Sequence, residues 1–213
     1  MYLFSRSIRL SGVKSQEATG WATRLTEVVK DLSGLDVGLW HTLFSGEVGK
    51  LSWTTFVPDM SALEGAFAKL DADAGMNELV ERGDEYVIQG TLSDVIGKVV
   101  HGQPDPSRKV NYVSVVATTI KAGKFARGYS LGVEIAQTAE KISGLPSLFV
   151  ANSTGDYSGV AWLSGFTDIA ELERAQNALD ESQIFVELLD TEVPGVYNDQ
   201  PGAAPRTLYR RIA

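Results

Sequence analysis

Alternating apolar positions near the N-terminus, followed by apolar positions at helical spacing, predict a strand and then a helix. The run YLFSRSIRL begins at residue 2 and reads as a strand. The next segment ends at Gly34 and carries one apolar stripe, made of Trp21, Leu25, Val28, Val29 and Leu32. The runs DVGLWHTLF and GKLSWTTFV then predict two strands, which the turn-type pair Ser45-Gly46 would join.

A second helix is predicted directly after these strands. Asp59 is placed to cap it, because its carboxylate can accept hydrogen bonds from N–H groups of the first turn. Leu63, Phe67 and Leu70 supply the apolar stripe. A short extra helix at 76–81 and a strand at 94–101 complete a β-α-β-β-α-β order.

The second half of the chain repeats this order. NYVSVVATTI predicts a strand. On the helix predicted after it, the residues expected to face inward are Leu131, Ile135, Ala139 and Ile142. SLFVANS and SGVAWLSGF predict the next two strands, and the D-x-x-E pattern of Asp168 and Glu171 predicts a capping box. Leu172, Ala175 and Leu179 pack the capped helix. An extra helix at 184–189 and the strand TLYRRI follow.

The two halves are also similar residue by residue. When 45–73 is compared with 154–182, 8 of 29 positions are identical, among them Trp53/Trp162 and Asp59/Asp168. Unrelated segments of average composition would share roughly two. The match follows a strand, a cap and a helix in the same order, so the sequence predicts a duplication.

The predicted fold class is therefore α+β, with two tandem ferredoxin-like repeats at 1–103 and 111–213. Residues 104–110 lie in a polar, proline-containing stretch that is typical of a linker. Two helices cover one face of each four-stranded antiparallel sheet and leave the other face open. We therefore expect the two sheets to pack together as an intrachain α/β barrel.

Charge and composition limit the classes of partner. The formal net charge of −8 argues against a nucleic-acid surface, which needs clustered Lys and Arg. No cysteine is present, which excludes disulfides, thiol nucleophiles and zinc–cysteine sites. The N-terminus does not resemble an export signal, and no apolar run approaches the roughly 18 residues of a membrane span. We expect a soluble, cytoplasmic protein without a nucleic-acid or membrane partner.

The segment GVAWLSGFTDIAELERAQNAL, followed by LYRRI, resembles the strand-three, helix-two and strand-four segment of the dimeric α/β-barrel (ferredoxin-like) superfamily. The resemblance covers essentially the whole chain, as a tandem-repeat member. Members include antibiotic-biosynthesis-type monooxygenases, haem-degrading enzymes, chlorite-dismutase-like proteins, lactone isomerases, polyketide cyclases and stress-responsive proteins. Because fold analogy is a weak guide to activity, the resemblance implies a small-molecule site without naming its substrate.

The haem residues of this superfamily are not matched. Haem-degrading members carry an Asn on the first strand and a His on the second helix, whereas the first strands here carry Phe4, Arg6 and Ile8, or Ser114, Val116 and Thr118. Chlorite-dismutase-like members hold haem through a helix His in the C-terminal half. The two histidines, His41 and His101, both precede that half. We therefore expect no haem and no other cofactor.

Arg6 and His41 are the candidate catalytic residues. His41 lies on a predicted strand and could act as a general base near neutral pH, or be a structural residue. Arg6 lies on an otherwise apolar strand, where burial of its charge requires a partner. Arg6 either neutralises an anionic ligand inside the barrel or pairs with a carboxylate.

Six further residues are candidates for substrate binding, and for three of them a structural role is an alternative. The candidates are Trp53, Trp162, Asn152, Thr55, Tyr209 and Arg211. The tryptophans occupy equivalent positions, which also fits a shared packing role. Asn152 adjoins a predicted turn, and turn chemistry would equally explain it. Tyr209 and Arg211 share one face of the last strand.

Motifs for nucleophilic, phosphoryl-transfer and metal chemistry are missing from the sequence. No His–carboxylate cluster has metal-ligand spacing. The leading hypothesis is a barrel site for a small apolar or anionic metabolite, in a cofactor-independent oxygenase, isomerase or cyclase. The competing hypothesis is a non-catalytic assembly or stress-response module, which would form a homo-oligomer.

Overall fold

The computed structural model describes residues 1–12, 15–44 and 49–213. Its elements, in chain order, are β1 (Tyr2–Arg9), α1 (Ser15–Ser33), β2 (Gly38–Leu43), β3 (Lys50–Val57), α2 (Met60–Asp71), α3 (Ala74–Glu81), the 3-10 helix η1 (Arg82–Glu85), β4 (Ser93–His101), β5 (Tyr112–Thr119), α4 (Phe125–Ser143), β6 (Ser147–Asn152), β7 (Gly159–Phe166), α5 (Ile169–Asp180), α6 (Gln183–Glu192) and β8 (Arg206–Arg211). Each predicted helix and strand is found, and the predicted turn pair Ser45-Gly46 lies outside the described residues.

The fold class is α+β, as predicted. The strands are hydrogen-bonded in the order β1-β3-β2-β8-β5-β7-β6-β4, which closes into a barrel. The chain divides into two compact units: the first unit is 1–96 with 210–213, and the second unit is 97–209. The repeat boundaries at 103 and 111 describe a duplication in the sequence and stay a prediction.

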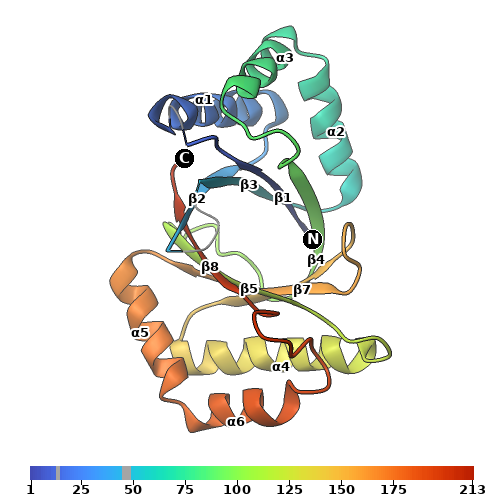
Figure 1. The fold of residues 1–213 in the computed structure, drawn as a ribbon, viewed down its shortest axis with the longest axis vertical. Helices are drawn as coiled ribbons and strands as arrows, with labels where there is room; N and C mark the ends of the chain where they lie inside the picture. Colours follow the sequence, from blue (N-terminus) through green and yellow to red (C-terminus); the bar gives the residue numbers. More distant parts are fainter. Residues whose placement is uncertain (13–14, 45–48) are drawn as a thin grey trace. The chain divides into compact units, whose positions relative to one another are not determined.

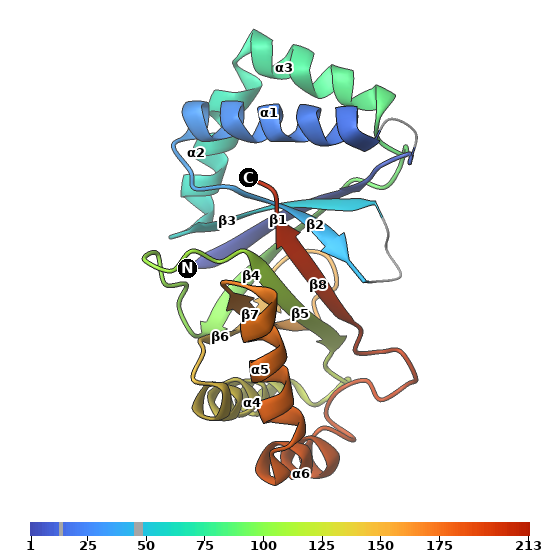
Figure 2. The ribbon, with the colours of Figure 1, turned by 90° about the vertical axis from the view of Figure 1, so that its left-hand side faces the viewer.

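In the first unit, three helices lie on one face of a sheet. β1 and β3 are antiparallel from Tyr2↔Val57 to Arg9↔Lys50, and β2 pairs along the other edge of β3. Figures 1 and 2 show α1, α2 and α3 on the same side of these strands, with α3 farther from them than α1. Alternate strand residues face the helices, and their apolar members form a core with α1 and α3 that includes Ile8, Leu39, Leu51 and Trp53.

The second unit has the same plan. β5 pairs antiparallel with β7, and β7 with β6. Figure 1 shows α4 against these strands, with α6 beyond it. The core between them is rich in aromatic rings, because Phe149, Trp162 and Tyr197 pack against one another with α4 at their side. Two units with one element order thus carry different residues between sheet and helices.

Both predicted helix caps form. The Asp59 carboxylate accepts a hydrogen bond from Ala62 N at 2.8 Å, and the Asp168 carboxylate accepts one from Glu171 N at 2.8 Å. Glu171 departs from the capping-box pattern, because its carboxylate accepts from the backbone N–H of Thr167 instead of the cap residue. It also pairs with Arg108 of the predicted linker. The cap of α5 therefore also fastens the linker to the second unit.

None of the helices in the described ranges is long and apolar enough to cross a membrane.

Candidate ligand pocket

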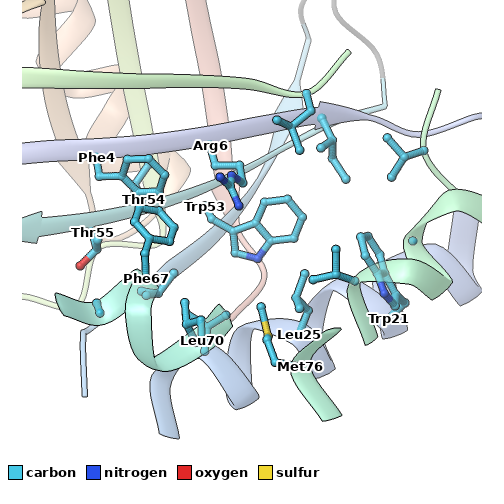
Figure 3. A pocket seen from close by; sticks show the side chains of 18 of the residues that line it. Phe4, Arg6, Trp21, Leu25, Trp53, Thr54, Thr55, Phe67, Leu70 and Met76 are labelled. Carbon is cyan, nitrogen blue, oxygen red and sulfur yellow. The ribbon is translucent and has the colours of Figure 1, made fainter. Parts of the chain in front are cut away.

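A cavity of about 280 Å³ lies within the first unit, between the sheet and the helices. Phe4, Arg6, Trp53 and Thr55 approach it from β1 and β3. The helical walls come from α1, α2 and α3, and their side chains are Trp21, Leu25, Val29, Leu63, Ala66, Phe67, Leu70, Met76 and Val80. Figure 3 shows the labelled members of this set converging on one space. The lining is predominantly apolar, which is usual for a small-molecule site.

Two tryptophans of the pocket are held by hydrogen bonds to helices. The indole Nε1 of Trp53 donates to Thr26 Oγ1 at 2.8 Å, and Nε1 of Trp21 donates to the carbonyl oxygen of Leu79 at 2.8 Å. Their rings meet edge to face, with centroids 6.2 Å apart. Because each polar ring atom already has a partner, the ring faces remain as rigid apolar walls.

Arg6 brings a charge into this apolar lining. Its Nε and Nη2 donate to the two carboxylate oxygens of Asp94 at 2.8 and 2.7 Å. The guanidinium also lies over the rings of Phe4 and Phe67, at 5.9 and 5.5 Å from their centroids. The hydrogen bonds to Asp94 raise the pKa of Arg6 above its usual value, against the opposing effect of burial. The bidentate pair therefore fixes a permanent cation at the pocket wall.

Thr55 contributes a hydroxyl that has no partner. The residue is only 4% exposed and lines the pocket, yet its Oγ1 makes no hydrogen bond within the described structure. A buried hydroxyl without a partner costs free energy of the order of 1–3 kcal/mol. A ligand oxygen or a water molecule in the pocket would remove that cost.

The mouth of the pocket is formed by residues that follow α2. Val80, Ile88 and Leu92 line it, although each of these residues is about half exposed to solvent. Asp84, which is also exposed, provides a carboxylate at the same rim. An apolar ligand would cover part of this exposed apolar surface on entering.

The corresponding positions of the second unit carry different side chains. The pairing partners of Trp53 are Arg6 on β1 and Leu39 on β2, whereas those of Trp162 are Val116 and Phe149. The isolated bridge Leu10↔Val87 in the first unit has the counterpart Ile120↔Tyr197 in the second. An arginine, a leucine and a valine are thus replaced by a valine and two aromatic residues.

These aromatic residues occupy the space between sheet and helix in the second unit. Phe149 stacks on Trp162 at 5.2 Å, and Tyr197 meets Trp162 edge to face at 5.3 Å. Phe149 and Tyr197 are 0% and 1% exposed, and the Tyr197 hydroxyl donates to the carbonyl oxygen of Gly128. Burial raises the pKa of Tyr197. The residues that would repeat the pocket therefore form a packed core.

The pocket brings together three of the eight candidate residues: Arg6, Trp53 and Thr55. They lie on the helix-facing side of the sheet. Trp162 belongs to the packed core of the second unit, where its Nε1 donates to the carbonyl oxygen of Gly132. The Asn152 side chain donates to the carbonyl oxygen of Asp156 and so closes the turn between β6 and β7.

The remaining candidates lie outside the lining of this pocket. Tyr209 is half-buried on β8. The Arg211 guanidinium lies 5.6 Å from the ring centroid of Trp40 and 3.9 Å from the carboxylate of Asp36. His41 is on β2, paired with Leu51. A catalytic role for His41 or a ligand role for Arg211 would need a second site, and stays a prediction.

His41 should give the protein a measurable pH dependence. Burial, and secondarily the nearby charge of Arg210, lower the pKa of His41 below its ordinary value of 6.5. The unfolded chain then takes up this proton more readily, so the free energy of unfolding falls as the pH decreases below 6.5. Urea denaturation at pH 8 and pH 5.5 should show a smaller acid loss for His41→Gln than for the parent. Equal losses would contradict the lowered pKa.

Several lining residues were not predicted as site residues. Trp21 and Phe67 were assigned to helix cores, because their spacing is that of any packed helix. No local sequence pattern marks Asp94 as a site residue, and it lies 88 residues from Arg6 in the chain. In the sequence, Asp94 is indicated only by the general need of an arginine on an apolar strand for a charged partner. Among the described residues there is no group of three or more side chains suited to hold a metal ion.

The chain has the fold of the dimeric α/β-barrel (ferredoxin-like) superfamily, as the sequence resemblance predicted. No protein-family model and no curated protein matches the sequence. Among solved structures, the chain is similar to two proteins described as "putative monooxygenase". The one from Fusobacterium nucleatum has a TM-score of 0.72 and 8% identity, over 100% of this chain and 92% of that chain.

The second of these proteins, from Lactobacillus acidophilus, has a TM-score of 0.65 and 10% identity, over 99% of this chain and 93% of that chain. An anthrone oxidase-like protein is similar at a TM-score of 0.66 and 10% identity, over 100% of this chain and 91% of its own. At these identities the likeness establishes the fold alone.

Proposed function

We propose that the protein binds a small, predominantly apolar metabolite in the pocket of the first unit. The observation that carries this proposal is an apolar cavity of about 280 Å³ whose wall holds an arginine and an unpartnered buried hydroxyl. An apolar cavity of about 150 Å³ is sufficient to bind benzene. A ligand of about two fused rings therefore suits the volume.

Aromatic side chains favour a flat ligand. Trp21, Trp53, Phe4 and Phe67 surround the space from the sheet and from two helices. Ring faces and edges attract other rings in stacked or edge-to-face geometry, beyond the gain from apolar burial alone. The few polar groups of the wall would then orient the ligand rather than supply most of its affinity.

For the reaction, we propose cofactor-independent chemistry of oxygenase, isomerase or cyclase type on that ligand. Of these, oxygenation is the first to assay, because the fold is shared with proteins described as monooxygenases and oxidase-like. In such a step an activated methylene reacts with O₂ to give a ketone and water. The lining supplies a charged donor, Arg6, whose hydrogen bond to a carbonyl oxygen of the ligand would make the adjacent methylene more acidic before O₂ attacks.

The alternative is a non-catalytic module, and one observation favours it. No histidine occurs among the described residues that line the pocket, and its carboxylate Asp84 is at the solvent-exposed rim. A reaction in the inner cavity would therefore depend on a ligand that loses its proton easily. Ligand binding without O₂ consumption would support this alternative and leave the binding proposal intact.

The binding proposal can be tested by filling the pocket. Ala66 lies on α2 with its side chain at the cavity, and Ala175 is its counterpart on α5 of the second unit. We expect Ala66→Leu to abolish the saturable quenching of tryptophan fluorescence by bicyclic ligands, because the added atoms occupy the cavity. Ala175→Leu should retain the quenching of the parent. Equal binding by both variants would contradict this location of the site.

A further inference from the structure

The charges around Arg6 restrict the kind of polar group that a ligand can present. Asp94 occupies two nitrogens of the guanidinium with both of its oxygens. The carboxylate of Asp71 is close enough to raise the pKa of Arg6 by its charge. Asp84 adds a further carboxylate at the rim of the same pocket. One cation is therefore outnumbered by the acidic groups near it.

Building on the proposed binding function, we propose that the ligand presents an uncharged carbonyl oxygen to Arg6, as a ketone or a quinone does. The third guanidinium nitrogen, Nη1, makes no hydrogen bond to any residue in the described ranges. Figure 3 shows the guanidinium directed into the pocket between Phe67 and Trp53. A carbonyl oxygen in the plane of the guanidinium would accept from Nη1.

The position of the donor is fixed from two sides. The rings of Phe4 and Phe67 are themselves in edge-to-face contact, with centroids 5.4 Å apart, and both lie against the guanidinium. The fork to Asp94 fixes the plane of the group. A donor held in this way is suited to recognise an acceptor in one direction, and little side-chain entropy is lost when the ligand binds.

Binding of an anionic ligand to Arg6 is disfavoured. A carboxylate bound to Nη1 would meet an arginine whose charge Asp94 already balances, in a pocket with a further carboxylate, Asp84, at its rim. A cationic ligand is disfavoured as well, because its charge would approach the guanidinium within an apolar cavity. A neutral carbonyl avoids both penalties and still receives a hydrogen bond from a charged donor.

Thr55 offers the ligand a second polar group, independent of Arg6. Phe4 pairs with Thr55 and Arg6 with Trp53, so Arg6 and Thr55 are diagonal neighbours on one face of the sheet. The hydroxyl of Thr55 can donate or accept. A ligand with a second oxygen across the ring system from its carbonyl would satisfy both groups, which fits a quinone or a hydroxyketone.

The test uses four ligands of matched shape: naphthalene, 2-acetonaphthone, 2-naphthoate and 2-naphthylmethylamine. Binding is measured by tryptophan quenching and by calorimetry at pH 7.5, where the last two ligands are charged. We expect the ketone to bind about tenfold more tightly than the carboxylate or the amine, and more tightly than naphthalene. Tightest binding of the carboxylate would overturn the inference and leave the proposed function standing. Binding of none of the four would contradict the proposed function itself.

Asp94→Asn provides a charge test of the same inference. The substitution removes the negative charge beside Arg6, so the carboxylate should gain about tenfold in affinity while the ketone changes little. Asp84→Asn, at the rim and not bonded to Arg6, should give a smaller gain in the same direction, and it serves if Asp94→Asn fails to fold. An unchanged preference in both folded variants would overturn the inference.

Discussion

Replacing Trp53 by alanine is expected to lower the free energy of unfolding by about 3–5 kcal/mol, as is usual for a buried tryptophan. The Trp53 side chain projects from β3, is 7% exposed, packs against Trp21 and belongs to the core of the first unit. Its loss would also remove one of the two hydrogen bonds of the Thr26 hydroxyl and enlarge the cavity. Urea denaturation followed by circular dichroism measures the change.

Trp53→Phe is the matched control. It retains most of the apolar volume and removes the hydrogen bond to Thr26. Because Thr26 also donates to the carbonyl oxygen of Ala22, its hydroxyl would not be left without a partner. We expect a loss of about 1–2 kcal/mol for this variant. A loss below about 1 kcal/mol for Trp53→Ala would show that the ring is not packed as described.

Replacing Gly132 by alanine is expected to destabilise the protein by about 3 kcal/mol, although alanine is the better helix former. A Cβ atom at this position of α4 would lie 2.1 Å from Cζ of Phe149. The ring cannot move aside easily, because it is fully buried and stacked on Trp162. Thermal and urea denaturation both report the loss.

Gly20→Ala on α1 is the control for the effect of alanine on helix stability without a steric clash. A Cβ atom there would meet no atom within 4 Å, and the residue is exposed. Gly20→Ala should therefore stabilise the protein by about 1 kcal/mol. The two glycine substitutions are expected to have opposite signs. Destabilisation of similar size by both would contradict the packing of Phe149 against α4.

Element order was predictable from the sequence because the local signals agree. Asp59 and Asp168 precede apolar stripes at helical spacing, and both carboxylates cap the helices that were predicted. Gly34 was predicted to end the first helix, and the structure gives it a φ of 74°, which glycine adopts without strain. Such features depend on neighbours in sequence, so a single chain is enough to find them.

The location of the pocket was not predictable in the same way. For Arg6 the sequence leaves two possibilities open, an anionic ligand inside the barrel or pairing with a carboxylate. In the structure Arg6 pairs with Asp94 and, with Phe4 and Trp53, lines a pocket on the helix-facing side of the sheet. The face of a short strand depends on which residue pairs with which, and one step in register reverses it. The pairing of Arg6 with Asp94 depends on contacts across the fold and leaves no local pattern.

The sequence also gives no local pattern for the difference between the pocket of the first unit and the packed core of the second. Trp53 and Trp162 are identical in the duplicated segments and suggested equal roles. Their surroundings differ through residues that were not singled out, since Phe149 and Tyr197 take the places of Leu39 and Val87. Single substitutions of this kind decide whether a space remains open, because packing is sensitive to the volume of individual side chains.

A crystal structure of the protein with 2-acetonaphthone bound would show directly whether the proposed site exists. We expect one ligand in the first unit, with its rings between Trp53 and Phe67 and its carbonyl oxygen within hydrogen-bond distance of Arg6 Nη1. Ligand density elsewhere, or a first unit whose side chains close the space between sheet and helices, would contradict this expectation.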